Sequence, residues 1–581
     1  MSDGRRVGLL RIAGAIAIAL LLISPSLVAQ ESGNQPPLAK THVAIAKRIE
    51  RGVVGITAQA PARKASYFGT GAFISEEGHI LTSITVVPSD CTIIKVIFPG
   101  GRRADATLVG TVDSLELSLI KVEGKGHPAI PLGESGKLRL GETVYTFGNC
   151  FSSIELDDRV SLSRGAVSGF YDLREKRSDA NYLGPCVEIT AALNPGVDGG
   201  PLVDERGAVI GLLCLNYSSA RWLGTAIPVD ALKPHLKKLM GSKEVAASAA
   251  PVPVKDEFRN PALAKAAAGV IALEVDRKKD IPDPPPPANR PKKPQQPQPN
   301  TPRAEEAKEF RLRPTAPVSA FLISSDGLAL TSYYNVAGEL NGIKARLPGG
   351  KSAPAKLIGW DESKDIALIR IEGKDFPLPV WAEDRSYRTG DAVYCLGKSP
   401  DPLRLTLTEG IVSSTARFLG DCIQLDAKIN YGSVGGPVVN ARGEVIGIAS
   451  HVTNVTDWGQ SSGIGFATTW TKIRAVLDEL KAGKQLKRPP QPFLGVQFDQ
   501  ETTDIDGVRI SEVTKGSAAE KAGIQGGDIV TEINEVEVRE PTDLAVEIRK
   551  FNVGDKVTLK IERGEKELEL TATLLARPEG Q

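Results

Sequence analysis

The chain of 581 residues is poor in histidine, in aromatic residues and in net charge. Its formal net charge is only +1 at pH 7, which argues against a nucleic-acid-binding protein and against a large basic membrane patch. Aromatic residues make up 5% of the chain, whereas 58 glycines and 40 prolines are present. This composition favours a turn-rich β protein with flexible joints, and the length favours three or four domains.

No long apolar segment follows the first thirty residues. Residues 1–11 carry three arginines, residues 12–23 are apolar, and Ser24-Pro25-Ser26 interrupts the run before Leu27-Val28-Ala29. We therefore expect a signal peptide over 1–29 and an exported protein of the periplasm or cell envelope. An uncleaved membrane anchor is the alternative, although the run is short for a membrane span.

The six cysteines lack CxxC spacing, which argues against zinc ligation and thioredoxin-like chemistry. Cys395 and Cys422 either form a disulfide, since each is the only local partner of the other, or remain buried thiols. We expect no metal and no cofactor.

The middle of the chain repeats its beginning. Four pairs of segments match in the same order, namely 71–87 with 319–336, 108–124 with 357–373, 161–169 with 406–414, and 186–201 with 422–437. Both copies alternate short predicted strands with Gly, Asp, Ser and Pro turns, and we expect little helix before residues 228–240 and 469–482. The pattern predicts two copies of one all-β barrel or sandwich domain, each closed by a C-terminal helix.

Two segments interrupt this pattern. Residues 246–256 are rich in Ala, Val, Pro and Ser and read as a linker, whereas 281–303 are dominated by proline. The proline-rich insert predicts extended polyproline II, either as a ligand for aromatic grooves or as a stiff solvated loop.

The C-terminal part has a different character. The sequences FLGVQF (493–498) and AGIQGGDIV (522–530) resemble a PDZ domain of the kind linked to bacterial proteases. The backbone N–H groups around Leu494, Gly495 and Val496 would hold a terminal carboxylate, and a bound peptide would add a strand beside 494–498. The candidate peptide-binding residues are Phe493, Leu494, Gly495, Val496, Leu544 and Ile548. Leu544 and Ile548, four apart on a predicted helix, are alternatively core residues only.

Within each copy a loop ends in Gly-Gly-Pro, NPGVDGGPLV at 194–203 and NYGSVGGPVV at 430–439. These loops resemble the nucleophile loop of trypsin-like serine proteases of the HtrA/Deg family, which reads Gly-Asn-Ser-Gly-Gly. The resemblance puts Asp198 and Val434 in the serine position. Ser433 adjoins Val434, but it occupies the family's asparagine position, so we expect its side chain to point elsewhere.

The other two triad positions follow from the same resemblance. The family's histidine lies in Thr-Asn-x-His-Val-Val, which corresponds to LTSITVV (81–87) and LTSYYNV (330–336). Thr85 and Tyr334 take its place, or Asn335 if the second register slips by one. The family's orienting carboxylate corresponds to Glu116 and Asp365.

Neither set of triad-equivalent positions contains an imidazole or a nucleophilic hydroxyl with a base beside it. These positions are Thr85, Glu116 and Asp198 in the first copy and Tyr334, Asp365 and Val434 in the second. Serine-protease chemistry needs both groups. The chain has five histidines, and His79 precedes Thr85 by six residues, about 20 Å along a strand. Acid–base or metal chemistry by Glu116 and Asp198 is a further alternative, but no third ligand joins them.

These observations predict an all-β-dominated chain. We expect a trypsin-like double β-barrel at 38–245, a linker at 246–256, a second such domain at 257–484, and a PDZ domain at 490–576. The resemblance implies peptide or unfolded-protein ligands in the cell envelope.

Two hypotheses for the function follow. The first is a non-catalytic pseudoprotease, a scaffold whose PDZ domain captures C-terminal peptides and whose barrels either hold the fold, associate with themselves or bind an active HtrA-like relative. The second is a serine endopeptidase of the HtrA/Deg type.

Overall fold

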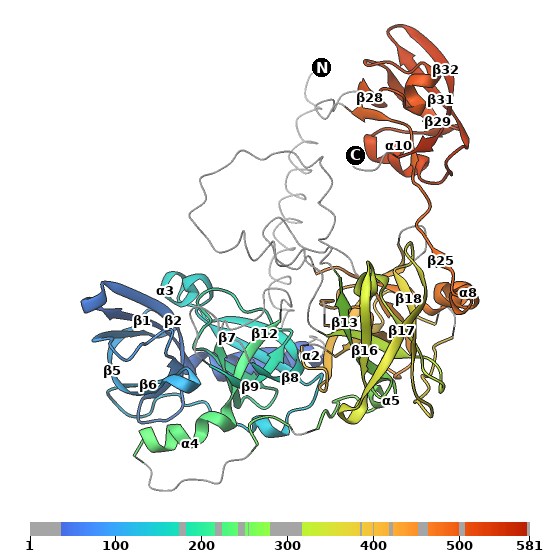
Figure 1. The fold of residues 1–581 in the computed structure, drawn as a ribbon. Helices are drawn as coiled ribbons and strands as arrows, with labels where there is room; N and C mark the ends of the chain where they lie inside the picture. Colours follow the sequence, from blue (N-terminus) through green and yellow to red (C-terminus); the bar gives the residue numbers. More distant parts are fainter. Residues whose placement is uncertain are drawn as a thin grey trace, which may run out of the picture. The chain divides into compact units, whose positions relative to one another are not determined.

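The computed structural model describes residues 37–173, 182–214, 223–241, 250–253, 255–278, 317–383, 386–398, 400–417, 422–430, 432–450, 463–498 and 506–577 (Figure 1). The predicted signal peptide and the proline-rich insert lie outside these residues. Two units are distinguished: the larger comprises 1–278, 314–357 and 368–475, and the smaller comprises 279–313, 358–367 and 476–581. No helix among the described residues is long and apolar enough to span a membrane.

The first copy consists of two six-stranded barrels. The first barrel contains β1 (Val53–Ala60), β2 (Ala65–Phe73), β3 (His79–Ser83), β4 (Ile93–Ile97), β5 (Arg103–Val112) and β6 (Leu117–Val122), and it closes in the order β1-β2-β3-β6-β5-β4. The second contains β7 (Thr143–Gly148), β8 (Ser161–Leu173), β9 (Gly184–Ile189), β10 (Pro201–Asp204), β11 (Val209–Cys214) and β12 (Gly224–Pro228). It closes in the order β8-β7-β10-β11-β12-β9, and helix α4 (Val229–Leu239) follows it.

The second copy repeats this arrangement. Its first barrel contains β13 (Val270–Arg277), β14 (Val318–Leu322), β15 (Leu328–Thr331), β16 (Leu340–Arg346), β17 (Ser352–Asp361) and β18 (Ile366–Ile371). Its second barrel contains β19 (Ala392–Gly397), β20 (Thr406–Arg417), β21 (Cys422–Leu425), β22 (Pro437–Asn440), β23 (Val445–Ala449) and β24 (Gly465–Thr469), followed by α8 (Trp470–Lys481). The tandem trypsin-like fold predicted from the internal repeat is thereby confirmed.

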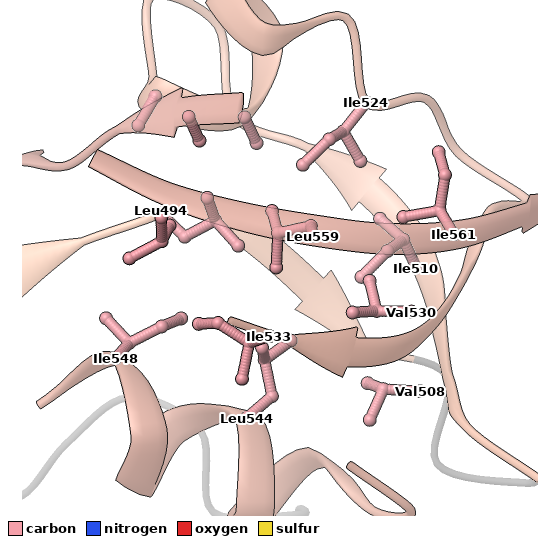
Figure 2. Packing of buried hydrophobic residues seen from close by; sticks show 14 of the residues in the cluster. Leu494, Val508, Ile510, Ile524, Val530, Ile533, Leu544, Ile548, Leu559 and Ile561 are labelled. Carbon is pink, nitrogen blue, oxygen red and sulfur yellow. The ribbon is translucent and has the colours of Figure 1, made fainter. Parts of the chain in front are cut away.

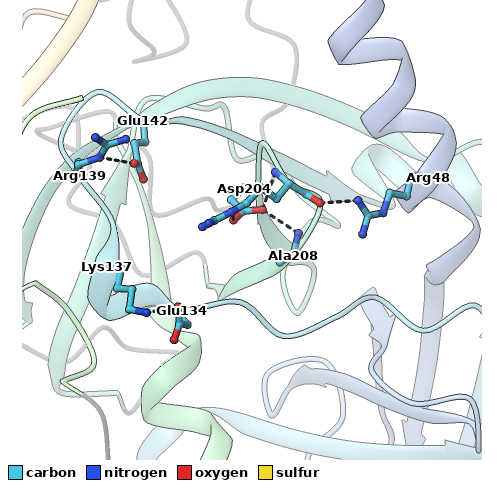
Figure 3. Close-up of polar contacts among 8 residues, drawn as sticks. Arg48, Glu134, Lys137, Arg139, Glu142, Asp204 and Ala208 are labelled. Carbon is cyan, nitrogen blue, oxygen red and sulfur yellow. Dashed lines mark hydrogen bonds and ion pairs between the residues drawn. The ribbon is translucent and has the colours of Figure 1, made fainter. Parts of the chain in front are cut away.

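One helix was not foreseen: α2 (Pro37–Ile49) precedes the first strand, where we expected little helix. It is amphipathic, with Ile45 and Ile49 buried in a cluster to which both barrels of the first copy contribute. Arg48 at its last turn donates a 2.6 Å hydrogen bond to the backbone oxygen of Arg206 (Figure 3). Arg206 lies in the turn between β10 and β11. Asp204 closes this turn, because its Oδ1 accepts from the backbone N–H of Ala208 at 2.9 Å. The helix therefore caps the barrel by tertiary packing, which a search for strand patterns does not detect.

The C-terminal domain lies in the smaller unit. Its strands are β27 (Val496–Phe498), β28 (Val508–Val513), β29 (Ile529–Ile533), β31 (Lys556–Arg563) and β32 (Lys566–Thr573), and its helices are α9 (Ala518–Ala522) and α10 (Pro541–Ile548). Branched aliphatic residues fill its core, where Leu544 and Ile548 of α10 face Leu494, Ile533 and Leu559 (Figure 2).

An ion pair between the partly exposed Arg563 and the buried Asp528 fixes the turn before β29 in this domain. Arg563 binds both carboxylate oxygens of Asp528, at 2.7 and 2.8 Å, and also donates to the backbone oxygen of Gly523. Bidentate geometry of this kind positions a turn more firmly than a single contact does.

All six cysteines lie among the described residues, and all are thiols. The alternative of a Cys395–Cys422 disulfide is therefore wrong, and the alternative of buried thiols is the one observed. Burial raises the pKa of Cys395 to about 12 and raises the pKa of Cys186 well above the usual value. A thiol with a raised pKa forms little of the reactive thiolate near neutral pH.

We expect these thiols to be protected in the folded chain. At pH 8 Ellman's reagent should react with Cys150, which is half-buried, and should leave the deeply buried Cys186 and Cys395 unmodified. In guanidinium chloride all six should react, because unfolding removes the burial that raises their pKa values. A count of four in denaturant would show a disulfide and contradict the structure.

Candidate functional site

The Gly-Gly-Pro loops are anchored in the same way in both copies. In the first copy the Thr70 hydroxyl donates to the backbone oxygen of Gly196 at 2.6 Å, and the Thr70 N–H donates to the backbone oxygen of Asp198 at 2.9 Å. In the second copy Ser319 replaces Thr70, and its hydroxyl donates to the backbone oxygen of Gly432 at 2.6 Å. The internal repeat therefore extends to individual hydrogen bonds of the loop.

Gly199 and Gly435 occupy equivalent, crowded positions with φ of +80° and +86°. A Cβ on Gly199 would lie 2.4 Å from the Thr82 hydroxyl, and a Cβ on Gly435 would lie 2.4 Å from the Thr331 hydroxyl. Because Thr82 and Thr331 each stand three residues before the predicted histidine position, this geometry supports Tyr334, rather than Asn335, as the counterpart of Thr85.

Replacing Gly199 with alanine should destabilise the larger unit by about 2–5 kcal/mol, because a left-handed backbone and a steric overlap both act at this residue. Gly126→Ala is the matched control, since Gly126 has φ of +77° and no atom within 4 Å of the added Cβ. Scanning calorimetry should show a much larger fall in Tm for Gly199→Ala. Equal falls in Tm for the two variants would contradict a structural role of Gly199 in the loop.

In the first copy the triad-equivalent positions carry a chain of hydroxyls that ends on a carboxylate. The Thr85 hydroxyl donates its single proton to Asp198 Oδ2. Ser83 Oγ lies 2.8 Å from Thr85 Oγ1, so Ser83 must donate in that bond. Both side chains at the histidine and serine positions are thus used in a contact with each other, and neither is a base that could activate a hydroxyl.

Glu116 has a structural part in the same region. Its side chain is buried, its φ is +51°, and its backbone oxygen accepts from the N–H of Ile84 at 2.9 Å. Asp365 in the second copy has the same φ of +51°. The acidic position is therefore a left-handed turn in both copies, a conformation that Asp tolerates better than most residues.

In the second copy the residue predicted to take the serine position belongs to the hydrophobic core. Val434 is 3% exposed and packs in the cluster that contains Val412 and Ile429. Beside it, Asn335 is fully buried and its amide donates to the backbone oxygen of Val434 at 2.9 Å. An aliphatic side chain in this position has neither a nucleophilic group nor an acid or base that could act on a substrate.

Ser433 is buried and turned toward its own loop. Its hydroxyl donates to the backbone oxygen of Asn430 and accepts from the N–H of the same residue, both at 3.2 Å. These two bonds close a tight turn.

Histidines in the described residues make contacts away from these loops. His42 Nδ1 contacts the hydroxyl of Tyr145 at 2.8 Å, His127 stacks on Phe73 with ring centroids 4.8 Å apart, and His235 is exposed on α4. His451 lies outside the described residues.

His79 does contact a serine, since its Nδ1 lies 2.8 Å from Ser75 Oγ. This pair closes the turn between β2 and β3, where the same hydroxyl accepts from the His79 N–H. The equivalent turn in the second copy has Ser324 accepting from the N–H of Leu328 at 2.8 Å. Because leucine stands there in place of histidine, the turn does not depend on an imidazole.

The backbone carbonyls of the PDZ loop accept hydrogen bonds from within the domain. The backbone oxygen of Leu494 accepts from Ala519 N–H and that of Gly495 from Thr514 N–H, each at 2.8 Å. Within the described part of the chain, no backbone acceptor takes the N–H of Leu494 or of Gly495. This arrangement suits a carboxylate cradle, in which successive N–H groups converge on an anion.

The six candidate peptide-binding residues divide by burial. Leu494, Leu544 and Ile548 belong to the core of the domain, whereas Phe493 and Val496 are half-buried. Gly495 has φ of +86°, and a Cβ there would lie 2.2 Å from Ser517 Cβ. Leu544 and Ile548 are therefore core residues in this structure; their role as the floor of a peptide pocket stays a prediction.

Family models match the chain in three segments. The trypsin-like peptidase domain matches residues 69–212 and 318–448, and the PDZ domain matches residues 492–574. Together these segments cover more than half of the chain, and each falls within one of the domains expected from the sequence.

Curated relatives match over one stretch of the chain. Two proteins described as "Probable periplasmic serine endoprotease DegP-like", from Brucella suis biovar 1 (strain 1330) and Rhizobium meliloti (strain 1021), are each 34% identical. The matches cover 46% and 44% of this chain, and 54% and 53% of those proteins. The chain thus spans about half the length of the curated relatives it matches.

Solved structures match part of the chain. The "HtrA-type protease AlgW with decapeptide" is 25% identical, with a TM-score of 0.37, over 55% of this chain and 98% of that one. The serine endoprotease from Yersinia pestis is 21% identical, with a TM-score of 0.36, over 55% of this chain and 97% of that one.

Proposed function

Since this chain belongs to the HtrA/Deg-like family of trypsin-like peptidases that carry a PDZ domain, we propose that it is a member that binds proteins without cleaving them. In this proposal the PDZ domain captures C-terminal peptides, and the two barrel domains serve as a scaffold in the periplasm. The relatives' descriptions as periplasmic, together with the export signal expected at 1–29, support the location.

The observation that carries the proposal is the contact between Thr85 and Asp198. Acyl transfer requires a hydroxyl activated by a base and backbone N–H groups that receive a developing oxyanion. A carboxylate at the serine position repels that oxyanion, and a threonine at the histidine position accepts no proton near neutral pH. The second copy supports the same conclusion, because Val434 is an aliphatic residue of the core.

The alternative function is that of a serine endopeptidase in envelope protein quality control. The names of the relatives from Brucella suis and Rhizobium meliloti favour it, since both are described as serine endoproteases. It needs a nucleophile and a base that are not at the triad-equivalent positions of either copy.

Peptide capture by the PDZ domain is proposed on the geometry of residues 493–496. The loop amides of Leu494 and Gly495 would hold the terminal carboxylate, and Val496 on β27 would pair with the peptide backbone. The half-buried Phe493 and Val496 would contact the last apolar side chain, with Ile548 below them.

A single binding experiment separates the two functions. The chain is mixed with a fluorescent peptide that ends in a free apolar residue, and binding is measured by anisotropy. Mass spectrometry of the same sample then reports the state of the peptide. Saturable binding with the peptide recovered intact is expected, whereas peptide fragments that accumulate with time would favour the endopeptidase.

A further inference from the structure

The two barrel domains meet within the larger unit through equivalent strands. Strand β8 of the first copy pairs with β20 of the second, antiparallel, with Gly169 opposite Thr406. In the internal repeat, segment 161–169 corresponds to 406–414, so β8 and β20 are the same strand in the two copies. Nothing in a tandem repeat requires that equivalent strands should face each other.

The register of this pair is centred on equivalent residues. Gly165 precedes Gly169 by four residues on β8, and Gly410 follows Thr406 by four residues on β20. Gly165 and Gly410 correspond in the repeat, so an antiparallel register through Gly169 and Thr406 is symmetric about them. One residue from this centre, Arg164 pairs with its own counterpart Glu409 at 3.8 Å. An antiparallel pair centred on matching residues is the arrangement that a two-fold rotation produces.

Both central glycines are required by the fold of their own copy. A Cβ on Gly165 would lie 2.1 Å from the backbone nitrogen of Ala191, and a Cβ on Gly410 would lie 2.4 Å from that of Ala427. The two strands therefore have the same local shape in their own copies, as a pseudo-two-fold relation between the copies requires.

Buried polar contacts extend the joint beyond the strand pair. Lys428 of the second copy donates to the backbone oxygen of Thr190 in the first at 2.8 Å, and burial lowers the pKa of Lys428. Arg404 lies over the ring of Phe170, 5.6 Å from its centroid, and pairs with Asp256 at 2.9 Å. These contacts join the two copies through buried side chains in addition to the strand pair.

The residues that lead into the second copy add to the joint. The backbone of Leu140 accepts from Arg259 N–H and donates to Glu257, at 2.8 and 2.7 Å. The Arg259 guanidinium reaches Thr143 Oγ1 at 2.6 Å and Glu205 at 3.1 Å. The segment before β13 thus forms part of the first copy's surface.

We propose that the two copies form a built-in pseudo-two-fold pair, in which β8 of the first copy and the equivalent strand β20 of the second are each other's partner. This inference is independent of the proposed function. The surface around β8 and β20 is then already occupied within one chain, and a further barrel domain, from a second copy or an active relative, must bind elsewhere.

An engineered disulfide tests the pairing in the full chain. A Cβ on Gly169 would lie 3.2 Å from Thr406 Cγ2, so cysteines at both positions fall within bonding reach. The variant Gly169→Cys/Thr406→Cys should form a cross-link on mild oxidation, found by peptide mass spectrometry. The control Gly169→Cys/Gly342→Cys should not, because Gly342 lies on β16 with no atom within 4 Å of an added Cβ. Absence of the Gly169–Thr406 cross-link in the folded variant would overturn the proposal.

Calorimetry of the unmodified chain provides the second measurement, should the cysteine variant not fold. The two copies should unfold in one transition, and Arg404→Ala, which removes the contacts to Phe170 and Asp256, should split it in two. Two resolved transitions for the copies in the unmodified chain would also overturn the pairing.

Discussion

Replacing Gly495 with alanine should weaken the binding of a peptide with a free, apolar C-terminus by at least about 100-fold, close to 2.7 kcal/mol. The added Cβ would lie 2.2 Å from Ser517 Cβ and 2.7 Å from its hydroxyl. Ser517 cannot easily move, because its hydroxyl accepts from Glu520 N–H at the start of α9. The loop must therefore shift, and its amides lose their alignment on the carboxylate.

Gly516→Ala is the matched control for this variant. Gly516 also has a left-handed backbone, with φ of +77°, but no atom lies within 4 Å of an added Cβ. It should lose stability without losing affinity for the peptide. Anisotropy titrations measure both variants, and their thermal unfolding shows whether the domain is intact.

The same assay on the unaltered chain keeps the idea testable if Gly495→Ala fails to fold. A peptide amidated at its C-terminus should bind far more weakly than the free acid, since the cradle of N–H groups needs an anion. Equal affinities for the acid and the amide would show that the domain does not recognise the terminal carboxylate.

Hydrolysis of unfolded casein by the full chain should stay at the background rate. Loss of the serine or the histidine from a serine-protease triad lowers turnover by on the order of 10⁶, and neither residue stands at the positions that we propose as triad-equivalent in either copy. Thr85→Ala and Ser433→Ala should leave the rate unchanged, because the first residue contacts Asp198 and the second closes a turn with Asn430. The release of acid-soluble peptides measures the rate.

A rate well above background that falls in Ser433→Ala would identify a working nucleophile in the second copy. Contamination by a host protease is excluded by the same comparison, since a contaminant does not respond to the variant.

Much of this architecture could be predicted from the sequence because it rests on short-range patterns. The internal repeat held its register over long stretches, and the structure reproduces that register down to Thr70 and Ser319, which anchor equivalent loops. The PDZ core followed from the same kind of pattern, since Leu494 of FLGVQF and Ile524 and Val530 of AGIQGGDIV lie in one hydrophobic cluster.

What the sequence could not predict depends on contacts between distant segments. Helix α2 owes its place to packing of Ile45 and Ile49 and to the bond from Arg48 to the 204–208 turn. The contact between Thr85 and Asp198 joins residues 113 positions apart. The Lys428–Thr190 contact between the copies joins residues 238 positions apart. No local periodicity encodes such pairings, which follow from the closed barrels.

The thiols show a further limit. The spacing of the cysteines in the sequence left a Cys395–Cys422 disulfide open. In the structure Cys395 lies on β19 and Cys422 on β21, and both side chains are buried. The positions of the cysteines can be read from the sequence, but the distances between their sulfur atoms depend on the fold of the barrel.

Covalent labelling with a fluorophosphonate probe, followed by peptide mass spectrometry of the full chain, tests the central claim most directly. The probe reacts with a serine only when a neighbouring base activates its hydroxyl. We expect no adduct on any peptide that contains residues 194–200 or 430–436. An adduct on Ser433, lost in Ser433→Ala, would contradict it.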